Sequence, residues 1–374
     1  MNLSSSVSLS GVDIGPAERR AVLAVLDSKR LALGPRVTAF ERAVADYVGV
    51  RHAVAVSSGT AGLHLVVRAL GLGAGDEVIT TPFSFVASAN CLLYERAKPV
   101  FVDIEPATFG LDPALVERRI TRRTKAILAV DVFGHPADWP GLERIARRHK
   151  LALIEDSCAA LGAAVGDRRC GAFGRAAVFA FYPNKQITTG EGGMVTTNDR
   201  RIADACRSMA NQGRRISGGA WLEHVQLGFN YRLDELSAAL GLAQMTRIDG
   251  ILARRRAVAA TYGRLLFGLT GVRAPAVAPW ATSSPFVYVV RLADEFTRRD
   301  RDRVLTSLRS QGIEASDYFR PIHMQPFYRR EFGYGPGDFP VAEAVGERTI
   351  ALPFHSRLKP AQAARAVAAL KEAL

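Results

Sequence analysis

Short apolar runs alternate with amphipathic stretches between residues 52 and 156. The apolar runs predict strands over 52–57, 77–80, 99–103, 126–130 and 151–156. The stretches between them predict helices over 60–70, 84–94, 113–120 and 139–149. Because strands that alternate with helices are typical of βα units, the pattern predicts an α/β protein whose mostly parallel sheet lies between helices. Ligands of such open sheets bind beyond the carboxyl ends of the strands.

The pattern changes in the last part of the chain. It is strongly helical over 234–265, strand-like over 286–291 and helical again over 360–374. A chain of 374 residues with 48% hydrophobic residues exceeds one average domain and can bury a sizeable core. We therefore expect a large domain over residues 1–250 and a smaller C-terminal α/β domain over residues 251–374.

Composition narrows the class of protein. No apolar run is long enough to cross a membrane, and the start Met1-Asn2-Leu3-Ser4-Ser5-Ser6 lacks the order of a secretory signal. The four cysteines have neither the close pairing of zinc sites nor the density of a disulfide scaffold. We expect a cytoplasmic protein with reduced thiols, no membrane partner and no metal site.

The formal net charge of +13 raises the question of a polyanionic partner. The basic residues are scattered in short pairs, and their densest run, 254–256, lies in a helical stretch where a solvated face is the usual arrangement. The pattern favours a small anionic substrate over nucleic acid.

Lys185 carries the strongest chemical signal. It follows a β-like apolar run that ends at Phe181 and precedes the cluster Gly190, Gly192 and Gly193, which lets backbone approach a ligand closely. A lysine in a partly dry pocket loses its proton more easily and can attack a carbonyl to form a Schiff base. A lone lysine after a strand is more often a solvated surface residue.

The turn Ser57-Ser58-Gly59-Thr60-Ala61 joins the first predicted strand to a helix. Free backbone N–H groups at such a helix start, with the hydroxyls of Ser58 or Thr60, can hold a phosphate. Taken alone, however, such a turn more often has a purely structural role, in which the hydroxyl caps the helix. The G-x-G-x-x-G spacing of nicotinamide-binding turns is missing.

Asp156 ends the strand predicted over 151–156, and Glu155 should point to the opposite face of the sheet. An aspartate there can keep the pyridine nitrogen of pyridoxal phosphate protonated, although a helix N-cap explains it equally well. Phe83 and Phe85 follow another strand, and one of them could lie on a cofactor ring unless both belong to the core.

Taken together, these elements resemble the DegT/StrS-type sugar aminotransferases over nearly the whole chain. The motifs that carry the resemblance are Ser58-Gly59-Thr60-Ala61, Pro82-Phe83-Ser84-Phe85, Ile154-Glu155-Asp156-Ser157, the stretch from Asn184 to Gly193, Gly228-Phe229-Asn230-Tyr231-Arg232 and Pro321-Ile322-His323-Met324-Gln325-Pro326.

The resemblance implies a pyridoxal-phosphate-dependent transferase of fold type I that works as a homodimer with shared active sites. It implies that Lys185 is the Schiff-base lysine, Asp156 the partner of the pyridine nitrogen and Phe85 the aromatic residue stacked on the cofactor. The phosphate cradle would consist of Gly59, Thr60 and Ala61, with Asn230 reaching it from the neighbouring subunit. His323 is similar to a small-domain histidine near the substrate, with a packed or surface histidine as the alternative.

Two positions depart from the family pattern. Ala159 stands where relatives often have a polar residue, and Ala180 stands where a serine often binds the phosphate. The resemblance implies transfer of an amino group from L-glutamate to a nucleotide-linked 4-keto-6-deoxyhexose. A 3-keto sugar or a keto-cyclitol as acceptor, a non-catalytic regulatory protein and a nicotinamide enzyme are the alternatives.

Overall fold

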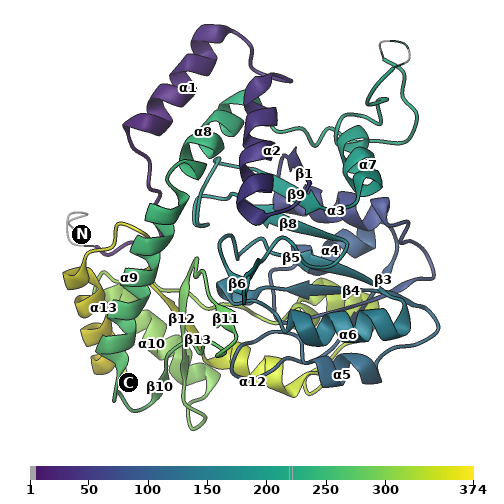
Figure 1. Ribbon diagram of the computed structural model, residues 1–374. Coiled ribbons are helices and arrows are strands. Elements are labelled where there is room, and N and C mark those ends of the chain that lie inside the picture. Colours follow the sequence, from purple (N-terminus) through teal and green to yellow (C-terminus); the bar gives the residue numbers. More distant parts are fainter. Residues whose placement is uncertain (1–5, 219, 221) are drawn as a thin grey trace.

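A seven-stranded sheet with the strand order β1-β9-β8-β5-β4-β2-β3 forms the centre of the larger part of the protein (Figure 1). The computed structural model describes residues 6–218, 220 and 222–374. The expectation that the first six residues are not part of a secretory signal therefore falls mostly outside the described residues. The strands of this sheet are β1 (His52–Val56), β2 (Glu77–Thr80), β3 (Lys98–Phe101), β4 (Thr124–Val130), β5 (Ala152–Asp156), β8 (Ala176–Ala180) and β9 (Gly193–Thr197).

Strands β3, β2, β4, β5 and β8 run parallel to one another, whereas β9 is antiparallel to both β8 and β1. The predicted α/β fold with a mostly parallel sheet is therefore confirmed, and it is the fold type I architecture. The antiparallel β9 directly follows the loop that carries Lys185, because the chain returns beside β8 after the glycine cluster.

Helices cover both faces of this sheet (Figure 1). Side chains of alternate strand residues pack against α3, α4 and α7 on one face and against α2, α5, α6 and α8 on the other. The helices of this part are α1 (Pro16–Ser28), α2 (Pro35–Val48), α3 (Gly59–Ala69), α4 (Ala87–Tyr94), α5 (Pro113–Arg118), α6 (Trp139–His149), α7 (Arg200–Ala210) and α8 (Glu235–Met245).

The predicted element boundaries differ most from the structure in two places, and elsewhere by one to two residues at an end. The helix expected over 84–94 begins at Ala87, because residues 82–86 form a turn instead. The helical stretch expected over 234–265 is divided at Thr246 and Arg247 into α8 and the longer α9 (Ile248–Leu266). Helices α1 and α2 were not among the predicted elements.

The C-terminal part has its own small sheet and core. Strands β10 (Val272–Arg273), β12 (Tyr288–Leu292) and β13 (Thr349–Leu352) form an antiparallel sheet, which packs on α9, α10 (Arg298–Ser310) and α13 (Pro360–Ala373). A helical pair, α11 (Pro326–Phe332) and α12 (Pro340–Arg348), lies between the two parts and packs on the core of the larger one.

A second three-stranded sheet is made of β11 (Ala281–Thr282), β6 (Ala164–Val165) and β7 (Arg168–Arg169), so it joins the two parts. Val7 packs in the C-terminal core, so the start of the described chain belongs with this part in space. The division at residue 250 stays a prediction. No helix among the described residues is long and apolar enough to cross a bilayer.

Candidate functional site

A cavity of about 550 Å³ lies beyond the carboxyl ends of β1, β4, β5 and β8. It brings together five residues that the sequence analysis names, since Gly59, Thr60, Phe85, Asp156 and Lys185 all line it. These residues come from four separate parts of the chain, and the topology of the sheet alone places them together.

Asp156 is buried at the end of β5, and its carboxylate is held from two sides. Its Oδ1 accepts a hydrogen bond from the backbone N–H of Cys158 at 3.1 Å. Its Oδ2 accepts one from the Ser88 hydroxyl at 2.7 Å. Ser88 in turn contacts the hydroxyl of Ser84, with 2.9 Å between the two oxygens. These donors fix the carboxyl group of Asp156 in the wall of the cavity.

Lys185 is half-buried and faces an aromatic side chain. Its Nζ lies 4.0 Å from the ring centroid of Phe286, within the range of a cation–π contact. Burial lowers the pKa of the Lys185 amine, while the nearby Cys158 and Asp156 oppose that shift. An amine with a lowered pKa is more often unprotonated and is therefore a better nucleophile and base at neutral pH.

Helix α3 begins at the edge of the cavity. Its N-cap is Ser58, whose Oγ accepts a hydrogen bond from the N–H of Ala61 at 3.1 Å. A Cβ at Gly59 would come within 2.8 Å of both the Ala180 Cβ and the Cys158 Sγ, so only glycine fits there. Of the three residues predicted to hold a phosphate, Gly59 and Thr60 line the cavity, whereas Ala61 does not and its N–H donates to the cap.

The remaining predicted residues differ in exposure and in whether they line the cavity. Phe85 lines the cavity but is 64% exposed, whereas Phe83 is fully buried in the core. Asn230 is exposed and does not line the cavity. His323 does not line it either, since its ring is fully buried and its Nε2 lies 3.0 Å from Glu343 Oε1. Burial lowers the pKa of His323, so its position favours the packed-histidine alternative.

Several residues of the cavity were missed from the sequence. Ser88, Asn184, Phe286 and Tyr318 all line it, and the Oδ1 atom of Asn184 is buried with no hydrogen-bond partner among the described residues. The spacing of Ser84 and Ser88 by four positions was a usable signal, because it places two hydroxyls on one face of a helical turn. Ala159 and Ala180, the two departures from the family pattern, also line the cavity.

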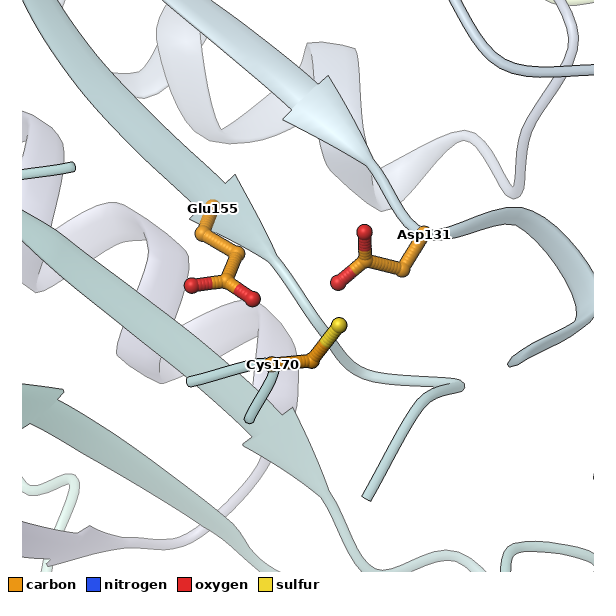
Figure 2. A group of neighbouring side chains, drawn as sticks. All are labelled: Asp131, Glu155 and Cys170. Carbon is orange, nitrogen blue, oxygen red and sulfur yellow. The ribbon is translucent and has the colours of Figure 1, made fainter. Parts of the chain in front are cut away.

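A second polar cluster lies on the opposite face of β5. Figure 2 shows the side chains of Asp131, Glu155 and Cys170 pointing toward one another. The Ser157 hydroxyl contacts Asp131 Oδ2 at 2.5 Å and Glu155 Oε1 at 2.7 Å. Glu155 therefore points away from Asp156, as the strand pattern predicts. Burial and the neighbouring Asp131 raise the pKa of Glu155, and burial raises the pKa of Asp131 to about 6.

Comparison with known proteins gives one consistent result. The sequence profile of the DegT/DnrJ/EryC1/StrS aminotransferase family matches residues 12–371. GDP-perosamine synthase of Caulobacter vibrioides is 40% identical over 370 residues, which cover 98% of each chain. The dTDP-3-amino-3,4,6-trideoxy-alpha-D-glucose transaminase of Streptomyces venezuelae is 38% identical, over 94% of this chain and 90% of the relative.

A solved structure agrees with these relatives. PseC of Helicobacter pylori, an aminotransferase involved in the biosynthesis of pseudoaminic acid, superimposes with a TM-score of 0.94 and 31% identity. The superposition covers 99% of both chains. The likeness therefore extends over both parts of the fold and is not confined to the central sheet.

Proposed function

Because the chain belongs to the DegT/DnrJ/EryC1/StrS aminotransferase family and is thus a pyridoxal-phosphate-dependent sugar aminotransferase, we propose that it moves an amino group from L-glutamate to a nucleotide-linked keto sugar. The acceptor is a 4-keto-6-deoxyhexose in this proposal. The observation that carries it is the single cavity lined by Lys185, Asp156 and the start of α3.

The residues of the cavity fit pyridoxal phosphate. The buried carboxylate of Asp156 is an acceptor for a protonated ring nitrogen, and among the described residues Lys185 is the one lysine that lines the cavity. The start of α3, where Gly59 lies against the Ala180 and Cys158 side chains, offers backbone N–H groups for a phosphate. The buried Asn184 Oδ1 has no hydrogen-bond donor among the described residues, so a ligand could supply one. Phe85 offers an aromatic face.

Each of these residues has a definite part in the proposed reaction. When bound, the cofactor supplies an electron sink for the negative charge that develops at the substrate carbon. Lys185 Nζ would hold the cofactor covalently and, once displaced by the donor's amine, would move the proton between the donor's α-carbon and the C4′ carbon of the cofactor. Asp156 would keep a positive charge on the ring nitrogen. Thr60 and Gly59 would hold the phosphate.

A larger cavity beside the first one gives room for the nucleotide. It measures about 880 Å³ and shares Ser84, Phe85 and Phe319 with the cavity of Lys185. Tyr94 and Arg320 also line it, and they offer a base-stacking surface and a cation for a diphosphate. These features support a nucleotide sugar as the substrate.

The proposed enzyme is a cytoplasmic homodimer with shared sites. Phe85 is 64% exposed although it lines the cavity, so another surface is needed to exclude water from its ring. The exposed Leu31 and Leu33, together with Asn230, lie outside the cavity and are available to a second copy. The four cysteines form no disulfide in the structure, which fits a reducing compartment.

Trapping of the cofactor tests the central role. The purified chain is incubated with pyridoxal phosphate, reduced with borohydride, digested and analysed by mass spectrometry. We expect the adduct on the peptide that contains Lys185. Lys185→Ala should form no such adduct and lose turnover about a thousandfold or more, while the exposed control Lys150→Ala keeps both. An adduct elsewhere, or substantial turnover by Lys185→Ala, contradicts the assignment.

Mixed dimers test the shared site. Lys185→Ala and Asn230→Ala are expected to be inactive or impaired alone, but they should regain activity when co-refolded, because one site of the mixed dimer then has both intact residues. Light scattering of each variant reports the oligomeric state. Absence of any regain between two dimeric variants would show that Asn230 does not act across the interface.

An acceptor with a 3-keto group is the second candidate, because one relative is named for a 3-amino product. A panel of 3-keto and 4-keto nucleotide sugars, each with glutamate, separates the two by NMR of the aminated carbon. Turnover of 3-keto sugars alone would overturn the 4-keto assignment without affecting the role of Lys185.

A further inference from the structure

Arg255 is a buried arginine that contacts the loop of Lys185. It lies on α9, the helix that leads from the large part into the C-terminal sheet (Figure 1), and only 3% of its surface is exposed. Its Nη2 donates a hydrogen bond to the Lys185 carbonyl at 2.7 Å and lies 3.5 Å from the carbonyl oxygen of Asn184. Its Nη1 donates to the Phe286 carbonyl at 3.3 Å.

These bonds join two segments whose side chains meet at the reactive amine. The Lys185 backbone and the Phe286 backbone are both held by the Arg255 guanidinium, and the Lys185 Nζ lies 4.0 Å from the Phe286 ring centroid. The next residue repeats the link, since Gln186 Nε2 donates to the carbonyls of Ser284 and Ala159 at 2.6 and 2.7 Å. The backbone of Lys185 is thus fixed against the 284–286 segment on both sides.

Burying a charged group raises the free energy of the folded protein unless hydrogen bonds of good geometry offset the lost hydration. Burial lowers the pKa of Arg255 to about 10, so the guanidinium still carries its charge at neutral pH. Its Nε has no hydrogen-bond partner in the part of the chain that the structure describes. A lysine at this position could not reach three carbonyls with one fixed planar group.

We propose that Arg255 is a positioning residue that sets the place and the basicity of the Lys185 amine. It acts through the Lys185 carbonyl, which determines where the side chain leaves the backbone, and through the Phe286 carbonyl, which places the Phe286 ring beside the Lys185 Nζ. Both effects keep the amine against Phe286 and partly dry, and a dry amine has a lowered pKa. The proposal rests on the assigned role of Lys185.

The test measures the Lys185 amine in the cofactor-free protein. Wild type, Arg255→Met, Arg255→Lys and the exposed neighbour Arg256→Met are labelled with trinitrobenzenesulfonate at several pH values, and the extent at Lys185 is read by peptide mass spectrometry. Lys371, which is exposed, is the internal reference. Circular dichroism and thermal unfolding establish that each variant is folded.

In Arg255→Met the pH midpoint for labelling of Lys185 should move upward, because the loop is no longer held against Phe286 and the amine gains water. At a pH below the midpoint its labelling rate should fall about tenfold relative to Lys371. Arg255→Lys, which keeps the charge but loses the planar fork, should show a smaller change in the same direction. Arg256→Met should match wild type.

The outcomes separate the possible failures. A midpoint for Lys185 that is unchanged in folded Arg255→Met and Arg255→Lys overturns the positioning role, whatever the loss in thermal stability. If Arg255→Met does not fold, Arg255→Lys decides alone. Failure of the proposed function looks different, since wild type itself would then give no borohydride adduct at Lys185 with pyridoxal phosphate.

Discussion

The two faces of β5 at its carboxyl end carry acidic groups in opposite circumstances. Asp156 faces a cavity, accepts hydrogen bonds from Ser88 and the Cys158 N–H, and shares the cavity with a lysine. Glu155, the residue before it, is packed in a closed interior beside Asp131, and both pKa values are raised. One strand thus presents a carboxylate available to a ligand and a carboxyl group withdrawn from all ligands.

The hydroxyl of Ser157 explains the state of the closed cluster. It lies within hydrogen-bond distance of both Asp131 Oδ2 and Glu155 Oε1, yet it has one proton to donate. The other carboxyl group must then donate to Ser157, so the pair retains one proton. The remaining oxygens are satisfied by the Trp139 indole and backbone N–H groups. Each carboxylate oxygen of the cluster therefore has a hydrogen-bond partner within the protein.

Replacing one carboxylate on each face should break this comparison most visibly. In the proposed function Asp156 would face the ring nitrogen of the cofactor, so Asp156→Asn should lower turnover about a hundredfold or more. Asp131→Asn keeps the shape on the closed face, can still donate to Ser157, and should leave turnover unchanged. Steady-state kinetics with saturating glutamate and keto sugar measures both. Equal losses in the two variants would mean that the faces are not functionally separate.

The second-largest expected effect is a difference in the pH dependence of stability between wild type and Asp131→Asn. A carboxyl group whose pKa is higher in the folded protein stabilises the fold below its unfolded pKa, and this contribution is lost as the pH rises through the folded pKa. For Asp131 the window runs from the ordinary aspartate pKa of 3.8 to a pKa of about 6. Wild type should therefore lose unfolding free energy relative to Asp131→Asn between about pH 4 and pH 7, on the order of 1–3 kcal/mol.

Urea denaturation of both proteins across this range measures the difference, with Asp46→Asn as a control for an exposed carboxylate. Two profiles that stay parallel from pH 4 to pH 7 would show that Asp131 does not share a proton in the folded protein.

The sequence was sufficient for one of the two faces. Lys185 follows a strand and Asp156 ends one, and parallel strands bring their carboxyl ends to the same edge, so both were candidates for one site. The alternation along β5 also predicted that Glu155 turns away from Asp156. Local periodicity and the order of the strands were enough for these placements, whereas the roles of Lys185 and Asp156 were implied by the family resemblance.

The partners on both faces could not be predicted in this way. Asp131 and Glu155 meet through the pairing of β4 with β5, and Arg255 meets the Lys185 carbonyl from a helix far along the chain. A buried arginine in the run 254–256 has the same sequence signal as its exposed neighbours, so the solvated face predicted for that run is wrong for Arg255 alone. Contacts of this kind depend on tertiary packing, on which local periodicity carries no information.

The smallest effect should come from the two serines. Ser88→Ala removes a hydroxyl that donates to Asp156 Oδ2, so the carboxyl group loses one of its two hydrogen-bond donors. We expect turnover to fall about threefold to tenfold with little loss of stability, since a typical intramolecular hydrogen bond contributes about 1 kcal/mol. Ser157→Ala removes the bridge on the closed face and should show the reverse, a loss of about 1–2 kcal/mol of unfolding free energy with turnover retained. Kinetics and urea denaturation of both variants give the four values, and the comparison of the faces fails if both serines affect the same quantity.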